Sequence, residues 1–179
     1  MGGSTAIRVA LREPRRVERL VLLGSGLHGF KATTPPSSLQ LDLSSAWERR
    51  DFVRILDLTE KTWAVGAERG RDSVDPGFLA LVRAMNRKAL DHLDVEREPL
   101  DHQTSDVDAI SRLSIPVLLV IGAYDTPQVR EAAEYIAERV PGARLVRMPD
   151  TARLPSLERP EAFEAQFEQW LHKTAAAAP

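Results

Sequence analysis

The sequence predicts an α/β fold with about three parallel strands and flanking helices. Two short apolar runs, Val17–Leu23 and Val117–Ile121, are each followed by glycine and are typical of buried parallel strands. A third run, Arg144–Met148, is short and alternating, which favours a strand near the edge of the sheet. Helical patterns stand between and after these strands. The alternation of strand and helix therefore favours a parallel sheet with right-handed crossovers.

Three helices are predicted in this α/β part. Residues 6–11 carry an apolar stripe at helical spacing, which Pro14 ends. Pro127 stands in the first turn of a second helix, which continues to the Pro-Gly pair at 141–142. Pro160 starts the last helix in the same way. The apolar residues on one face of that helix are Phe163, Phe167, Trp170 and Leu171.

The segment 27–112 has a different pattern and predicts a helical insertion in the α/β part, because it contains no convincing strand. Residues 33–38 and 98–106 predict loops. One helix is expected to be capped by a serine at 44–45, and another to start at the Asp-Pro pair 75–76. The apolar residues of these helices are Trp47, Phe52, Ile55 and Leu56 in the first, and Phe78, Leu79, Leu81, Val82 and Met85 in the second.

The composition excludes several classes of protein. The 179 residues carry a net charge of −2, so a general attraction to nucleic acid or to an anionic membrane is not supported. The chain has no cysteine, which excludes disulfides, thiolate zinc sites and a cysteine nucleophile, and which agrees with a cytoplasmic protein. No apolar run is long enough to span a membrane, and no signal peptide is recognised. Residues 175–179 predict a disordered tail.

Two charged residues follow consecutive strands of the predicted sheet. Asp125 comes after Val117–Ile121 by a tight turn, and Arg153 precedes a Leu-Pro pair in the loop after Arg144–Met148. This arrangement resembles the C-terminal end of an α/β-hydrolase, where these two loops deliver the aspartate and the histidine of a catalytic triad. The resemblance implies that Asp125 is a vestigial triad acid and that Arg153 stands in place of the histidine. Arginine cannot act as the base, because its side chain has five donors and no acceptor.

The start of the chain resembles the same family. Residues 1–6 match the half of a nucleophile elbow that follows the serine, so the resemblance covers essentially the whole chain. It implies that 1–26 and 113–174 form the remnant of a hydrolase core and that 27–112 forms its cap. On this mapping the nucleophile would lie one residue before Met1. Met1 would then occupy the position whose N–H normally stabilises the oxyanion.

The cap is expected to contribute to a substrate pocket lined by His28, Trp47 and Trp63. In the family, apolar cap residues such as Trp47, Trp63, Phe52 and Met85 would line that pocket; the alternative is that they form the cap's own core. His28 follows the first strand and is the least implausible substitute for the missing base, with a surface or packing role as the alternative.

Other polar residues near these loops have structural alternatives. Asp125 could instead cap the following helix, and Arg153 could either pair with Asp125 or be a solvated loop residue. Ser4 and Ser25 lack the context of a nucleophile elbow and are interpreted as caps or turns. Glu158 is interpreted as a charge at the start of the last helix rather than a general acid.

Residues 24–29 spell G-x-G-x-x-G after a strand, which is the pattern of a dinucleotide site. That site needs a helix beginning at the motif, whereas residues 30–36 include two prolines and oppose a helix. No acidic residue ends a strand about 20 residues later, as the motif requires. We therefore expect neither a dinucleotide nor any other cofactor, and no metal.

Together these features predict an α/β-hydrolase-like protein that is truncated and inactive as a Ser-His-Asp hydrolase. The resemblance implies ester, lactone or carbon–carbon bond hydrolysis as the family reaction, with a small ester or lactone-like ligand. One alternative is a non-enzymatic binding or assembly partner that uses the cap pocket, or the exposed edge at Val17–Leu23 with a second copy or a partner chain. Another is a full-length hydrolase whose true start lies upstream. Arg153 would still leave the base missing, and Arg153→His alone is not expected to restore activity.

Overall fold

The computed structural model describes residues 2–66, 68–92 and 105–175, and its centre is a parallel sheet in the order β1-β2-β3. Leu20 lies opposite Val117, and Leu118 lies opposite Arg144. The prediction of three parallel strands is confirmed, although the first begins later than Val17. The strands are β1 (Leu20–Leu23), β2 (Val117–Gly122) and β3 (Arg144–Met148).

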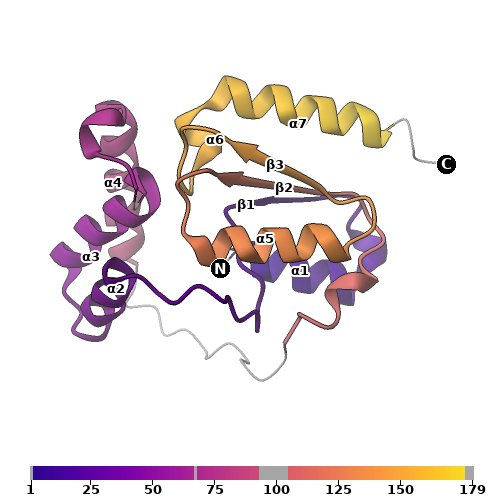
Figure 1. Ribbon diagram of the computed structural model, residues 1–179, viewed down its shortest axis with the longest axis horizontal. Helices are drawn as coiled ribbons and strands as arrows, with labels where there is room; N and C mark the ends of the chain where they lie inside the picture. Colours follow the sequence, from indigo (N-terminus) through magenta and orange to yellow (C-terminus); the bar gives the residue numbers. More distant parts are fainter. Residues whose placement is uncertain (1, 67, 93–104, 176–179) are drawn as a thin grey trace.

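Helices cover both faces of the sheet, α7 on one and α1 with α5 on the other (Figure 1). Leu118 packs with Trp170 of α7, whereas the next residue, Leu119, packs with Ile7 of α1 and Ile136 of α5. This division follows from the alternation of side chains along a strand. No helix in the described ranges is both long and apolar enough to cross a membrane. The three helices are α1 (Gly2–Arg12), α5 (Pro127–Arg139) and α7 (Pro160–Ala175).

The segment between β1 and β2 contains helices and loops in its described part, and most of its helices gather at one end of the sheet (Figure 1). We call this group the cap. It lies beyond the carboxyl ends of the strands, where parallel sheets place their sites. Its longer helices are α2 (Ser38–Glu48), α3 (Phe52–Thr59), the π-helix η2 (Glu60–Val65) and α4 (Pro76–Leu90). The short helices among the described residues are η1 (Pro14–Arg16), η3 (Arg71–Ser73), η4 (Ile110–Arg112) and α6 (Pro155–Glu158).

The start of the cap differs from the prediction. The prediction of a single helix capped at residues 44–45 was wrong. Ser37 caps α2 through a reciprocal capping box with Gln40. Arg50, just after the end of α2, adopts a positive φ of 54°, so the helix does not continue through it. Asp51 begins the next helix by accepting a hydrogen bond from the N–H of Arg54 (3.0 Å). Asp75 caps α4 through the N–H of Phe78, so the predicted start of that helix is confirmed.

The connection from the sheet into the cap is held against α5. The Glu131 carboxylate accepts hydrogen bonds from the N–H and hydroxyl of Thr33 and from the N–H of Thr34 (2.6, 2.9 and 3.0 Å). Hydrogen bonds from Thr34 and Thr33 lower the pKa of Glu131 to about 2. Gln128 donates to the carbonyls of Thr34 and Pro35. These contacts fix where the cap begins relative to the sheet.

β1 is an edge strand of the described sheet, because only β2 pairs with it. Leu22 is buried beneath the helices, whereas Leu23 is 37% exposed. The predicted position of this strand at an edge is confirmed. A row of unpaired backbone groups on such a strand can template pairing with another chain.

Candidate functional site

Asp125 stands just beyond the carboxyl end of β2. Its N–H donates to the carbonyl of Gly122 (3.2 Å), which closes the turn, and the N–H of Tyr124 donates to the carbonyl of Thr151 (2.9 Å). The second bond ties this turn to the loop that follows β3. The Asp125 side chain is fully buried. The two loops that the sequence singled out therefore meet at the site-bearing edge of the sheet.

Arg153 is bonded directly to Asp125. Its Nε donates to Oδ1 of Asp125 (2.8 Å), and its Nη2 donates to the Thr126 hydroxyl (2.9 Å). The N–H of Thr126 donates to the same Asp125 oxygen (2.7 Å). The backbone N–H of Arg153 donates to the carbonyl of Trp63 in the cap (3.0 Å), and the guanidinium lies 5.6 Å from the Trp63 ring centroid. The predicted pair is present. The alternative that Asp125 caps α5 is wrong, because Thr126 occupies that position.

A pocket of about 290 Å³ opens above this pair, between the cap and the sheet. Trp47 and Trp63 from the cap and Thr126 and Arg153 from the core all line it. The structure thus brings both predicted tryptophans to the position of the missing base, while their role in ligand binding stays a prediction. No described histidine is among the lining residues. The remaining lining residues are Gln40, Leu43, Ser44 and Thr62.

Burial raises the pKa of Asp125, and the positive charge of Arg153 opposes that shift only in part. Oδ2, the second carboxylate oxygen, is buried without a hydrogen-bond partner among the described residues. It faces Gly24, where an added Cβ would lie 3.2 Å from this oxygen and 2.7 Å from the carbonyl oxygen of Arg153. Gly24 also has a φ of +50°, so glycine there relieves both the crowding and the backbone strain.

We expect Asp125→Asn to change how stability depends on pH. A raised pKa means that the folded protein binds this proton more tightly than the unfolded chain. The resulting contribution to stability is complete below the unfolded pKa of about 3.9 and is lost as pH rises through the higher folded pKa. The stability of the wild type relative to the variant should therefore fall with rising pH in urea unfolding. The exposed Asp42→Asn serves as control. A difference that grows with pH would show that the ion pair outweighs burial.

Glu158 contributes to the site in a way that the sequence did not predict. It is the last residue of α6 and is buried, rather than a charge at the start of the last helix. Its Oε2 accepts from the N–H of Ala152 (3.0 Å), beside Arg153, and its Oε1 pairs with Arg69 of the cap (2.7 Å). Arg69 is itself buried and also donates to the carbonyls of Ala64, Val65 and Asp150. No spacing in the sequence signals this pair, because its partners are far apart along the chain.

The two serines near the start of the chain have structural contacts. The hydroxyls of Ser4 and Ser25 both donate to the carbonyl of Gly26, at 3.1 and 3.0 Å. Ser4 lies inside α1, so its expected role as a cap or turn residue is wrong. Met1 and the tail beyond Ala175 lie outside the described residues.

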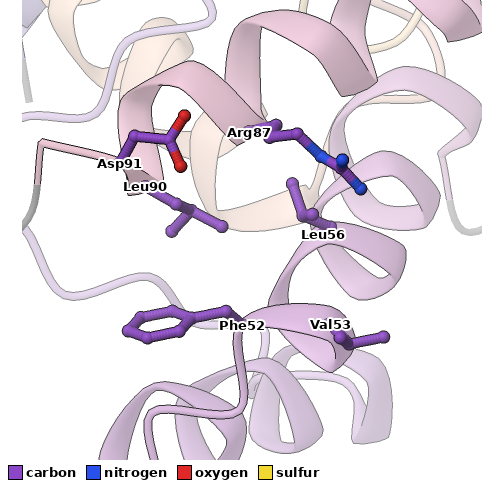
Figure 2. A pocket seen from close by; sticks show the side chains of 6 residues that line it. All are labelled: Phe52, Val53, Leu56, Arg87, Leu90 and Asp91. Carbon is purple, nitrogen blue, oxygen red and sulfur yellow. The ribbon is translucent and has the colours of Figure 1, made fainter.

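The predicted residues His28, Phe52 and Met85 do not line the pocket above Arg153. His28 is half-buried, its carbonyl accepts from the N–H of Asp106 (3.1 Å), and it does not line the pocket above Arg153. Trp47, Phe52 and Met85 are between 43% and 53% exposed, so they do not form a buried core of the cap. Phe52 lines a second pocket of about 510 Å³ between α3 and α4 (Figure 2). The other residues of that pocket are Val53, Leu56, Arg87, Leu90 and Asp91.

Similar proteins are found in sequence and in structure, although no family model matches the chain. The pimeloyl-[acyl-carrier protein] methyl ester esterase of Nitrosomonas europaea is 30% identical, over 94% of this chain and 67% of that protein. The corresponding esterase of Pectobacterium atrosepticum is 27% identical, over 93% of this chain and 65% of that protein. The chain thus spans about two thirds of the length of these curated relatives.

Solved structures show the same fold. An enol-lactonase from Burkholderia xenovorans superposes with a TM-score of 0.68 and 19% identity, over 96% of this chain and 63% of that one. A thermophilic esterase gives a TM-score of 0.66 and 20% identity, again over 96% and 63%. At these identities the likeness establishes the architecture alone. The esterase of 30% identity, which this chain matches over two thirds of its length, shows that the chain belongs to the α/β-hydrolase superfamily. The parallel sheet agrees with that assignment.

Proposed function

We propose that this chain is a member of the superfamily that does not hydrolyse esters through a serine–histidine–aspartate relay. It keeps the pocket between cap and sheet as a binding site for a small molecule. The observation that carries the proposal is the hydrogen bond from Nε of Arg153 to Oδ1 of the buried Asp125. Because of this bond, the side chain that Asp125 orients is a guanidinium rather than the imidazole of a triad.

The chemistry of the guanidinium supports the proposal. A triad histidine takes a proton from the nucleophile through one nitrogen while its other nitrogen donates to the aspartate. Arg153 also donates to Asp125, but its guanidinium has no lone pair with which to accept a proton. The aspartate thus keeps a cationic partner, and the relay loses its base. His28, which the sequence suggested as a substitute for the missing base, does not line the pocket.

The test is turnover of p-nitrophenyl esters by the purified chain, compared with Asp125→Ala and the nearly isosteric Asp125→Asn. We expect the same low rate from all three proteins, because loss of triad function costs several orders of magnitude in rate. Circular dichroism shows whether each variant is folded. If Asp125→Ala does not fold, the nearly isosteric Asp125→Asn still provides the comparison. Wild-type turnover that both variants abolish while folded would contradict the proposal.

A second role, in assembly, is favoured by the outer edge of β1, with which no described strand pairs and at which Leu23 is exposed. A parallel strand from another copy or a partner chain could complete the sheet there. Light scattering on the purified chain is expected to show association that increases with concentration. Leu23→Lys, which places a charge on this edge, should weaken that association. A monomer at every concentration would rule out self-association through β1.

A further inference from the structure

The pocket above Asp125 offers hydrogen-bond donors that the protein itself does not use. Arg153 commits Nε to Asp125 and Nη2 to Thr126, whereas its Nη1 has no hydrogen-bond partner among the described residues. The Thr126 hydroxyl accepts from Arg153, so its own proton remains available to a ligand. Both side chains line the pocket. A planar guanidinium beside a hydroxyl donor suits the two oxygens of a carboxylate.

The electrostatics of the pocket also favour an anion. None of its described lining residues is acidic, and Asp125, which neutralises part of the Arg153 charge, is buried behind it. Thr126 is the N-cap of α5, so the positive end of a helix of 13 residues points toward this region. Because Arg153 is held at Nε, its remaining donors are oriented before any ligand arrives, which lowers the entropic cost of binding.

Three of the eight residues that line the pocket are apolar, and the space is small. Leu43, Trp47 and Trp63 supply hydrophobic surface, and the Arg153 guanidinium lies near the Trp63 ring. Trp47 is 43% exposed, so part of its surface is available for contact with a ligand. A volume of about 290 Å³ is at the lower end of the range for ligand pockets, roughly 300–1,000 Å³. The space therefore suits a short chain or a single ring.

We infer that this pocket binds a small organic carboxylate, with its oxygens on Arg153 and Thr126 and its apolar body between Trp47 and Trp63. The inference rests on the proposed function in one respect: the ligand is held and not turned over. The chemical class follows from the unused donors of Arg153 and Thr126 and from the two tryptophans that line the same pocket.

Calorimetric titration with phenylacetate and hexanoate tests this inference, with phenylacetamide and hexanamide as neutral controls. We expect saturable binding of at least one acid and a loss of roughly 10- to 100-fold for its amide, the range for a hydrogen bond to a charged group. Failure of both acids to bind more tightly than about 10 mM would overturn the inference, and so would equal affinity for acid and amide. Since a carboxylate is not an ester, this outcome is independent of the turnover assay.

Two variants locate the site. Asp125→Asn preserves an oxygen acceptor for Nε but removes the competing negative charge, so it should tighten binding of the acid several-fold. Adding Arg153→Gln to Asp125→Asn should then weaken binding by roughly 10- to 100-fold without leaving a buried charge unpaired. Arg139→Gln makes the same change on a surface arginine and should leave the affinity unaltered. Unchanged affinity in the double variant would overturn the assignment to Arg153.

Discussion

Replacing Glu158 by alanine is expected to lower the free energy of unfolding by about 3–5 kcal/mol, the usual cost of leaving the other member of a buried ion pair alone. Glu158 and Arg69 are both more than nine-tenths buried, and their oxygen and nitrogen lie 2.7 Å apart. The change also removes the acceptor for the N–H of Ala152. Urea unfolding followed by circular dichroism measures the effect.

The matched control for this change is Glu138→Ala. Glu138 pairs with Arg139 on the exposed surface of α5, and such surface pairs contribute about 0–1 kcal/mol. We expect the control to unfold close to the wild type. Equal, small losses in the two variants would contradict a role for the Arg69–Glu158 pair in joining the cap to the loop that carries Arg153.

Replacing Gly122 by alanine should also lower the free energy of unfolding substantially, for a steric reason. A Cβ at this position would collide with the carbonyl oxygens of Thr151 and Ala152, which are backbone atoms and cannot rotate away. The loop bearing Arg153 would have to move off the end of β2. Overpacking of this kind costs about 1–3 kcal/mol and sometimes more, and we expect the upper end here. Thermal unfolding of the purified variant provides the measurement.

Gly26→Ala is the control for that variant, because an added Cβ at Gly26 meets nothing within 4 Å. Its stability should remain within about 0.5 kcal/mol of the wild type, as at most surface positions. If Gly122→Ala were equally harmless, the close approach of the Arg153 loop to β2 would be refuted.

The sheet and the Asp125–Arg153 pair were predictable because local patterns specify them. The apolar run Val117–Ile121 and its following turn place Asp125, and the carboxyl ends of parallel strands meet at one edge. A loop after the adjacent strand therefore had to bring Arg153 near that carboxylate. The sequence pattern was therefore sufficient to bring the two loops together, whereas it left open whether Arg153 pairs with Asp125 or faces solvent.

The contacts of the cap were not predictable in the same way. The break between α2 and α3 depends on the positive φ of Arg50, which a run of helix-compatible residues does not reveal. The Arg69–Glu158 pair joins the connection between η2 and η3 to the end of α6, and their approach depends on how the cap packs. His28 was predicted to line the pocket because it follows β1 closely. The core residues that line the pocket follow β2 and β3 instead, and they are Thr126 and Arg153.

The central claim is that Arg153, at the position of the triad histidine, is hydrogen-bonded to Asp125. The NMR signal of the Arg153 Nε–H tests this claim most directly. The signal can be assigned by its disappearance in Arg153→Lys. Because Nε donates to a fully buried carboxylate at 2.8 Å, we expect a resolved resonance at neutral pH that exchanges slowly with solvent. A signal that exchanges as fast as that of an exposed arginine would mean that Asp125 is free to orient another group, and the account would be wrong.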